Sequence, residues 1–264
     1  MTLAAELEAI AIAVAREGGD LARRRRGEGV AIAATKSALA DIVTEADREV
    51  EALIRERIAV ARPDDGFLGE EDGIHAGTSG ITWVVDPIDS TVNYAFGIPA
   101  YATSVAAVMG PPTPDAWEVL AGAVYSPAHG ELFHAAAGHG AWLDGRRLAV
   151  NAAPGQAGAL VATGFGYDAT THAADLAVVG KVMPIARDIR RMGAAALDIA
   201  YVAAGRLDGF FERGLKPWDH AAADLLVTEA GGQVAWFDDD ERPLLAVAGP
   251  ELLGPLVAAA SDRV

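Results

Sequence analysis

The sequence predicts a mixed α/β (α+β) fold made of two subdomains. Apolar residues at helical spacing occupy roughly the first 60 residues, strand-like segments follow from residue 67 to residue 150, and strands alternate with helices after residue 158. With 264 residues, the chain can bury a substantial core as one large domain or as two smaller units. No Gly/Ser-rich linker separates the halves, so we expect residues 1–150 and 151–264 to form subdomains that share an interface.

Two helices are expected near the N-terminus. Leu3, Leu7 and Ile10 begin a near-helical apolar spacing over residues 3–26, and glycines at positions 27 and 29 follow as a stop. A second apolar stripe runs over residues 44–60, and Pro63 prevents this helix from continuing. Both helices precede the main run of expected strands.

The rest of the chain is expected to form a strand-rich middle and an alternating C-terminal part. The middle is rich in Val, aromatic residues and alternation, which predicts strands at 67–69, 82–86, 101–109, 118–126, 131–137 and 141–150. In the C-terminal part we expect strands at 160–165, 185–192, 209–213 and 233–237. The helices expected there cover residues 172–182 and 194–204, and two further helices begin at residue 218 and at about residue 250.

The composition narrows the possible chemistry. The absence of Cys excludes disulfides, thiolate metal sites and a cysteine nucleophile. The formal net charge is −16, and the one dense basic cluster, Arg23–Arg26, would point its side chains in different directions around a helix. A nucleic-acid partner is therefore not expected, because that binding needs clustered Lys and Arg. Such acidity would also repel a phosphate substrate unless bound cations reverse the sign locally.

No membrane span or secretory leader is expected either. No stretch approaches the roughly 18 uninterrupted apolar residues of a spanning helix, and acidic residues precede the basic cluster near the N-terminus. We therefore expect a cytoplasmic protein with no membrane partner. The six histidines lack zinc-site spacing, and no Gly-rich dinucleotide pattern follows a strand, so neither zinc hydrolysis nor a dinucleotide cofactor is indicated.

Three short segments carry acidic residues at strand ends or helix starts: Gly-Glu-Glu-Asp at 69–72, Asp-Pro-Ile-Asp-Ser-Thr at 86–91, and Trp-Asp at 218–219. Because Pro87 cannot extend a strand ladder, the strand should end at Asp86, and Asp89 should emerge into the same turn. Each segment also has an ordinary interpretation, as a solvated loop, a common turn, or a helix N-cap at Asp219. Taken together, they would supply the oxygen ligands that Mg²⁺ prefers.

A cluster of this kind suits the hydrolysis of a phosphate monoester. The reaction requires charge on the phosphoryl oxygens to be offset, a water to be placed in line and the leaving oxygen to be stabilised, and two divalent cations can meet all three needs. Two like charges about 4 Å apart cost on the order of 1 kcal/mol in water and about 4 kcal/mol at an effective dielectric of 20. The cluster therefore needs cations to persist. Backbone N–H groups after Asp89 would form a cradle for phosphate.

These segments resemble the inositol monophosphatase family, part of the lithium-sensitive magnesium phosphatase superfamily. The resemblance covers nearly the whole chain, because the segments at 69–72, 83–99 and 218–232 stand in the family's order and spacing, and residues 35–47 resemble its Lys-containing stretch that ends in a functional Asp. The resemblance implies a layered αβαβα sandwich and a homodimer. It also implies hydrolysis of a small phosphorylated substrate by metal-activated water, foremost of inositol 1-phosphate to myo-inositol and phosphate.

The resemblance further implies the metal ligands, with most of them in the N-terminal subdomain and Asp219 in the C-terminal one. Glu70, Asp86 and the carbonyl of Ile88 would hold one Mg²⁺, and Asp86, Asp89 and Asp219 would hold a second. A third, weaker ion would sit near Glu70. Each site would therefore hold two or three Mg²⁺ ions.

The remaining roles that the resemblance implies concern water and substrate. Thr91, helped by Asp47, would orient and deprotonate the attacking water together with Glu70. Asp47 is also an ordinary helix-capping residue in the segment Thr-Glu-Ala-Asp. The residues implied for phosphate and substrate binding are Ser90, Thr91, Asp89, Ala194, Ala195 and Glu212. Lys36 and His220 stay open, the first as a phosphate or surface residue, the second as a site neighbour or a partly buried helix residue.

One position departs from the family pattern. The family usually has Gly between the metal Asp and the Thr, and this chain has Ser90. A Cβ there restricts the backbone and crowds phosphate, so either the local geometry tolerates it or activity is altered. The Ser90 hydroxyl would then be available for a hydrogen bond to phosphate.

Other functions remain open on the same scaffold. Fructose-1,6-bisphosphatase, histidinol-phosphatase, nucleotide 3′-phosphatase and NADP phosphatase activities share these metal residues. Glu212 and the segment 91–99 favour the inositol branch. A non-catalytic protein that binds a divalent ion for structure is a further alternative, and turnover of simple monoesters separates it from an enzyme.

Overall fold

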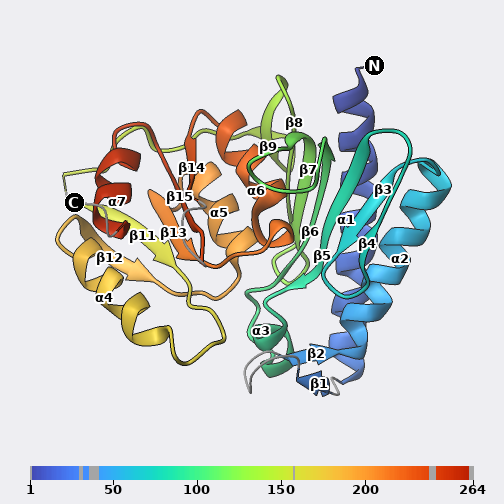
Figure 1. The fold of residues 1–264 in the computed structure, drawn as a ribbon, viewed down its shortest axis with the longest axis horizontal. Coiled ribbons are helices and arrows are strands. Elements are labelled where there is room, and N and C mark those ends of the chain that lie inside the picture. Colours follow the sequence, from blue (N-terminus) through green and yellow to red (C-terminus); the bar gives the residue numbers. More distant parts are fainter. Residues whose placement is uncertain (1, 30–31, 36–41, 157, 238–241, 262–264) are drawn as a thin grey trace.

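Two β-sheets alternate with three layers of helices along the long axis of the molecule (Figure 1). The structure is a computed structural model, and it describes residues 2–29, 32–35, 42–156, 158–237 and 242–261. The order of layers is helices, larger sheet, helices, smaller sheet, helices. This arrangement confirms the predicted αβαβα sandwich.

The larger sheet has eight strands in the order β10-β9-β8-β7-β6-β5-β3-β4. Neighbouring strands are antiparallel, except that β3 and β5 are parallel. The strands are β3 (Gly66–Gly69), β4 (Gly73–His75), β5 (Ile81–Asp89), β6 (Ala102–Met109), β7 (Glu118–Ser126), β8 (Glu131–Ala136), β9 (Gly140–Leu143) and β10 (Arg146–Arg147).

Helices α1 (Leu3–Glu28) and α2 (Glu45–Ala61) cover the outer face of this sheet (Figure 1). Leu7, Ile54 and Trp83 are fully buried in the core between them. Gly19 lets α1 approach the sheet closely, because a Cβ at this position would lie 2.5 Å from the ring of Tyr125. Close contact between a glycine face and an aromatic side chain therefore fixes α1 against β7.

The smaller sheet has five strands in the order β12-β11-β13-β15-β14. β11 pairs in parallel with β12 and β13, and β15 pairs antiparallel with β13 and β14. The strands are β11 (Ala159–Thr163), β12 (Ala186–Arg190), β13 (Gly209–Arg213), β14 (Gln233–Phe237) and β15 (Leu244–Ala248). Helices α4 (His172–Val182) and α7 (Leu253–Ala260) cover its outer face.

Helices α5 (Ala195–Ala203) and α6 (Pro217–Glu229) lie between the two sheets (Figure 1). One continuous core joins Phe133 of the larger sheet, Leu226 of α6 and Phe210 of the smaller sheet, and all three side chains are fully buried. Both sheets therefore pack on the same pair of helices, which holds the edges of the two sheets in a fixed relation.

Three short elements complete the part of the chain that the structure describes. β1 (Ile32–Thr35) and β2 (Ile42–Thr44) form an antiparallel pair, and α3 (Thr91–Phe96) follows β5 directly. Lys36, which the sequence left open as a phosphate-binding residue, lies outside the described residues. In the described part, no helix is both long enough and apolar enough to span a bilayer. The cytoplasmic location stays a prediction.

The sequence located most elements, and the structure corrects it in several places. The strand predicted at 141–150 is a hairpin, because Asp144 and Gly145, with φ of 48° and 80°, form a turn between β9 and β10. Strand β15, a short run of buried apolar residues, was not predicted, and the last helix begins at Leu253 rather than near residue 250. A short apolar run carries no period that tells a strand from a helix.

A further correction concerns β5, which does not end at Asp86. It continues through Pro87 to Asp89, and its pairing with β6 shifts there, since Asp86 lies opposite Ser104 while Asp89 lies opposite Ala102. Three steps along β5 thus match two steps along β6, which is the signature of a bulge. In a regular strand, residues an odd number apart point to opposite faces. The bulge instead places Asp86 and Asp89 on the same face.

Candidate active site

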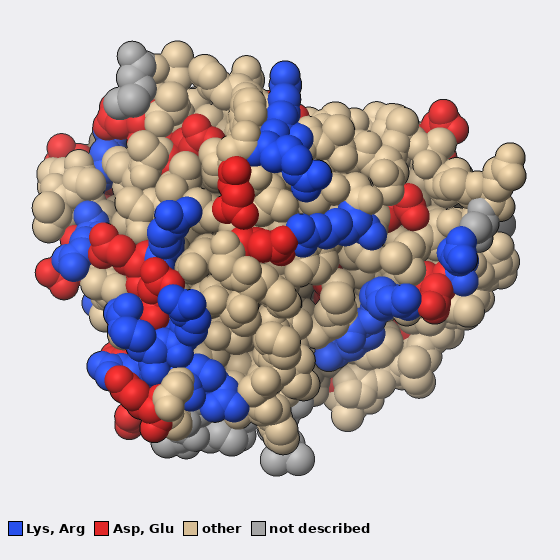
Figure 2. Space-filling model, turned by 180° about the vertical axis from the view of Figure 1, so that it is seen from behind, with Lys and Arg blue, Asp and Glu red and all other residues tan. Residues whose placement is uncertain are grey.

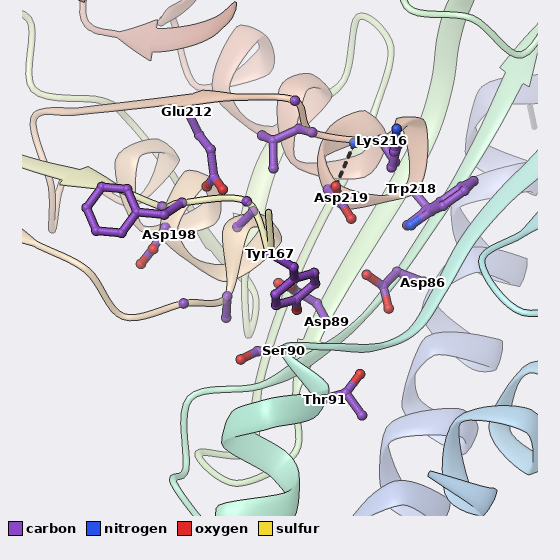
Figure 3. Close-up of a pocket in the computed structure, with 18 of the residues that line it drawn as sticks. Asp86, Asp89, Ser90, Thr91, Tyr167, Asp198, Glu212, Lys216, Trp218 and Asp219 are labelled. Carbon is purple, nitrogen blue, oxygen red and sulfur yellow. Dashed lines mark hydrogen bonds between the residues drawn. The ribbon is translucent and has the colours of Figure 1, made fainter. Parts of the chain in front are cut away.

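A cavity of about 400 Å³ opens where the larger sheet, the smaller sheet and the two central helices meet. Its lining comes from the end of β5, the start of α3, the loop after β11, the start of α5, and the segment between β13 and α6. Figure 3 shows Asp86, Asp89 and Asp219 around its centre, with Ser90 and Thr91 to one side. The cavity is therefore built from both halves of the sequence.

Asp86, Asp89 and Asp219 reach this cavity from two elements. The bulge in β5 turns Asp86 and Asp89 to the side of the sheet that faces the central helices, where they are 2% and 6% exposed. Asp219 sits in the first turn of α6, and its Oδ2 accepts a hydrogen bond of 2.6 Å from the backbone N–H of Lys216. Asp219 is thus not the N-cap residue that the sequence allowed, because Lys216 occupies that position.

Asp89 also fastens the smaller half of the molecule to β5. Its Oδ2 accepts a hydrogen bond of 2.9 Å from the backbone N–H of Ala196, and the amide of Leu197 also bonds this carboxylate. Both amides belong to the first turn of α5, whose N–H groups have no partner within the helix. The carboxylate therefore satisfies helix donors and complements the positive end of the helix dipole.

The electrostatics of this cluster are unfavourable without a counter-charge. Burial raises the pKa of Asp86 well above its ordinary value, and the nearby charges of Glu70, Asp89 and Asp219 raise it further. Burial, then the charge of Asp219, raises the pKa of Asp89 in the same direction. Burial raises the pKa of Asp219 to about 7. Like charges in a desolvated place resist ionisation, so the cluster favours a bound cation or protons.

The residues present fit divalent cations. Asp86 Oδ1 is buried and has no hydrogen-bond partner, and the donors around it are all oxygen, the type that Mg²⁺ prefers. Among the described residues, no three His, Asp or Glu side chains stand so that they could hold a metal ion as they are. The structure therefore brings the predicted ligands into one cavity without closing them into a cage, and an unpaired buried oxygen is the feature that a cation would satisfy.

Thr91 and Asp47 form a hydrogen-bonded pair beside the carboxylates. Thr91 Oγ1 donates to Asp47 Oδ1 at 3.1 Å, and Asp47 Oδ2 accepts from the N–H and hydroxyl of Thr44 at 2.8 and 2.5 Å. Thr44 caps α2, so both interpretations of Asp47 hold geometrically: it caps a helix and it bonds Thr91. Burial raises the pKa of Asp47 to about 7.

Glu51 holds the loop that carries Glu70. Its carboxylate, 2% exposed, accepts hydrogen bonds from the backbone N–H groups of Glu71 at 2.9 Å and Asp72 at 2.8 Å. A Cβ at Gly69 would lie 2.4 Å from Glu51 Oε2, so only glycine leaves room for this carboxylate. Glu51 was not predicted as a site residue. A Glu in the sequence of α2 is typical of a surface position, and only the structure shows that the loop carrying Glu70 packs against it.

The part of the cavity that is predicted to bind the polyol is lined by the predicted residues and by two further charged residues. Glu212, Ala194 and Ala195 line the cavity as predicted, and burial raises the pKa of Glu212 to about 8. Asp198, on the first turn of α5, and Arg191 line the same region. Neither residue was predicted from the sequence. Asp198 falls in an apolar helical run, where a single acidic residue is typical of the polar face of a helix.

Nearly all residues predicted for the site come together. The cavity is lined by Glu70, Asp86, Ile88, Asp89, Ser90, Thr91, Ala194, Ala195, Glu212 and Asp219. Asp47 lies behind Thr91 and reaches the cavity only through it. His220 does not line the cavity. It is fully buried between Trp236 and Trp117 and bonds Asp224 Oδ2 at 2.6 Å, so it is a core residue.

The layered fold and the acidic cavity identify the class of this protein, and the sequence model of the inositol monophosphatase family matches residues 3–261. The chain belongs to the inositol monophosphatase family and is a phosphatase. The family is generally metal-dependent. This confirms the resemblance and the enzyme class predicted from the sequence.

Two similar proteins align with most of this chain. Nus factor SuhB of Escherichia coli strain K12 is 40% identical over 261 residues, covering 97% of this chain and 96% of that protein. Inositol-1-monophosphatase SuhB of Mycobacterium tuberculosis strain H37Rv is 40% identical over 248 residues, covering 87% of this chain and 83% of that protein.

A solved structure shows the same fold at high coverage. The extragenic suppressor protein suhB from Bartonella henselae matches with a TM-score of 0.88 and 34% identity over 98% of this chain and 99% of that chain. An inositol monophosphatase from Anabaena matches with a TM-score of 0.79 and 30% identity, covering 96% of this chain and 94% of that one.

Ser90 adopts the left-handed conformation that its place in the family pattern favours for Gly, with φ of 72° and ψ of 60°. We expect Ser90→Gly to raise the free energy of unfolding by about 0.5–1 kcal/mol, because left-handed backbone costs a residue with a Cβ about 1–2 kcal/mol, and the freedom of Gly in the unfolded chain offsets part of this. Urea denaturation measures the change. Phosphatase activity should be retained, since the backbone already has the conformation that Gly would take.

The matched control is Asp144→Gly in the β9–β10 turn, the other non-glycine residue with positive φ among those described. It should give a similar gain in stability with no effect on turnover. A loss of stability in Ser90→Gly alone would mean that the Ser90 side chain contributes more than its backbone strain costs.

Proposed function

We propose that this phosphatase hydrolyses small phosphate monoesters in a Mg²⁺-dependent reaction, with inositol 1-phosphate as the leading substrate. The observation that carries the proposal is the unpartnered, buried Asp86 oxygen among like-charged carboxylates, beside a Thr–Asp hydrogen bond and a polar cavity. The Mycobacterium tuberculosis relative is named an inositol-1-monophosphatase, which supports the substrate. Mg²⁺ is supported by the all-oxygen donor set.

The residues that would hold the cations are Glu70, Asp86, the Ile88 carbonyl, Asp89 and Asp219. Bound divalent cations would offset charge on the phosphoryl oxygens, favour deprotonation of water and stabilise the leaving oxygen. Asp86 is central to this set, because it lies on the same face of β5 as Asp89 and feels the charges of Glu70 and Asp219. Asp89 and Asp219 also have backbone supports that limit their movement, from the amides of Ala196 and Lys216 respectively.

Thr91 and Asp47 would handle the attacking water. The Thr91 hydroxyl donates its hydrogen to Asp47, so its oxygen is free to accept a hydrogen bond from water. As the water oxygen bonds to phosphorus, the bond from phosphorus to the substrate oxygen breaks. The water proton would pass through Thr91 toward Asp47, while Glu70 orients the water from the other side. The leaving alcohol oxygen then takes up a proton.

The other end of the reaction centre would bind the substrate. The amides of Ser90 and Thr91, at the start of α3, would donate to the phosphoryl oxygens. Glu212 would accept hydrogen bonds from polyol hydroxyls, and Ala194 and Ala195 would leave room for the ring at the start of α5.

Phosphate release tests this proposal. We expect wild-type protein to hydrolyse inositol 1-phosphate only with Mg²⁺, and Asp89→Asn to lose at least about 100-fold in kcat/KM, because the substitution removes one carboxylate charge from the metal set. The assay includes fructose-1,6-bisphosphate, histidinol phosphate, adenosine 3′,5′-bisphosphate and NADP, so that a different preferred substrate is detected.

The matched control is Asp188→Asn, which makes the same chemical change at an exposed residue of β12 that pairs with Arg190. It should leave turnover unchanged. Circular dichroism checks that Asp89→Asn is folded. Wild-type turnover that is unaffected by chelation of divalent ions would contradict the metal role, and no turnover of any monoester would contradict the substrate class.

We further propose a homodimer that uses the end of α3 and the segment that follows it. Phe96 and Ile98 are 74% and 48% exposed, which places two large apolar side chains together on the surface. Multi-angle light scattering should give twice the mass of the chain, and Phe96→Asp should give the mass of one chain. Met183→Asp, at an exposed apolar residue of a different layer, should stay dimeric. A monomeric wild type at micromolar concentration would refute the dimer.

A further inference from the structure

Asp198 is a buried carboxylate that faces the cavity and that the proposed reaction does not use. It is 1% exposed, and its Oδ1 is buried without a hydrogen-bond partner. In Figure 3 it lies next to Glu212, on the side of the cavity away from Asp86. A buried carboxylate without partners is costly, so its position calls for a ligand that donates hydrogen bonds.

Arg191 brings the opposite charge to the same part of the cavity. Its guanidinium lies over the ring of Phe165, with 5.7 Å from Cζ to the ring centroid. It lines the cavity, and its charge partly opposes the burial that raises the pKa of Asp198 to about 8. Among the described ion pairs the two groups do not meet within 4.0 Å. A donor and an acceptor of opposite charge therefore face one cavity with space between them.

The chemistry of this pair selects one class of ligand group. A metal ion is disfavoured beside a guanidinium, and a purely apolar group would leave both charges unsatisfied. A hydroxyl suits both, because it can donate to a carboxylate and accept from a guanidinium at once. Phosphoryl groups suit Arg191 but not Asp198 or Glu212, which would repel them.

We propose that Asp198 is a specificity-determining residue that accepts a hydrogen bond from a polyol hydroxyl of the substrate, while Arg191 donates to the same or a neighbouring hydroxyl. The proposal deepens the proposed function and rests on it. Asp198 lies on α5 and Glu212 on β13, so the two carboxylates bind hydroxyls at different positions of the ring. Substrates with few hydroxyls would gain nothing from Asp198.

The test compares two monoesters in one assay: inositol 1-phosphate, which carries ring hydroxyls, and phenyl phosphate, which carries none. In an assay above pH 8, where the Asp198 carboxylate is ionised, Asp198→Asn should lower the ratio of their kcat/KM values by about 10- to 100-fold, the loss expected when a charged hydrogen-bond acceptor is removed. The Tm of the variant should not fall, because the substitution replaces a buried carboxylate whose Oδ1 has no hydrogen-bond partner.

Asp175→Asn is the matched control. Asp175 is also buried, but it is paired with both terminal nitrogens of Arg242 at 2.9 and 3.0 Å. Its substitution should lower the Tm and leave the ratio of the two substrates unchanged, as expected for a structural carboxylate. The two variants thus separate a binding role from a structural one.

The outcomes are distinguishable. A wild type that hydrolyses neither monoester overturns the proposed function, and the role of Asp198 with it. A wild type that hydrolyses both, with an Asp198→Asn variant whose substrate ratio is unchanged or whose Tm drops as in Asp175→Asn, overturns only the role of Asp198.

Discussion

The structure depends on keeping like-charged carboxylates buried together at the place where its two sheets meet. Asp86 and Asp89 share a face only because β5 carries a bulge, and Asp89 reaches across to the amides of α5. Asp219 enters from α6, the other helix between the sheets. Repulsion among these groups works against folding, and the surrounding core and backbone hydrogen bonds must offset it. A bound cation would satisfy the Asp86 oxygen that the protein alone leaves unpaired.

The residues that position this cluster do not themselves line the cavity. Glu51 binds the amides of the loop that carries Glu70, and Thr44 holds Asp47, which in turn bonds Thr91. Thr91 and the loop that carries Glu70 are therefore held by hydrogen bonds from α2 or its N-terminus. Such supports restrict side-chain movement more than loop packing alone would, and they tie the reaction centre to the outer helical layer.

Most helices and strands could be predicted from the sequence because their periods are clear and turn residues separate them. The layered αβαβα arrangement followed from the family resemblance. Sequence reasoning also found the residues that line the cavity, because the family pattern fixes their order. It failed where tertiary context decides: Pro87 does not end β5, since a bulge absorbs it, and β15 is a short apolar run without a period. Asp198 was missed because its burial depends on the other sheet.

Binding of Mn²⁺, followed by electron paramagnetic resonance with Mg²⁺ as competitor, would show whether the buried carboxylates form a cation site. We expect the wild-type chain to bind more than one Mn²⁺ and Mg²⁺ to displace it. Asp86→Asn should weaken binding by at least about 10-fold, since Asp86 supplies the unpaired buried oxygen. Wild-type protein that binds no Mn²⁺, or an Asp86→Asn variant that binds it as tightly, would contradict the claim that these carboxylates form a cation site.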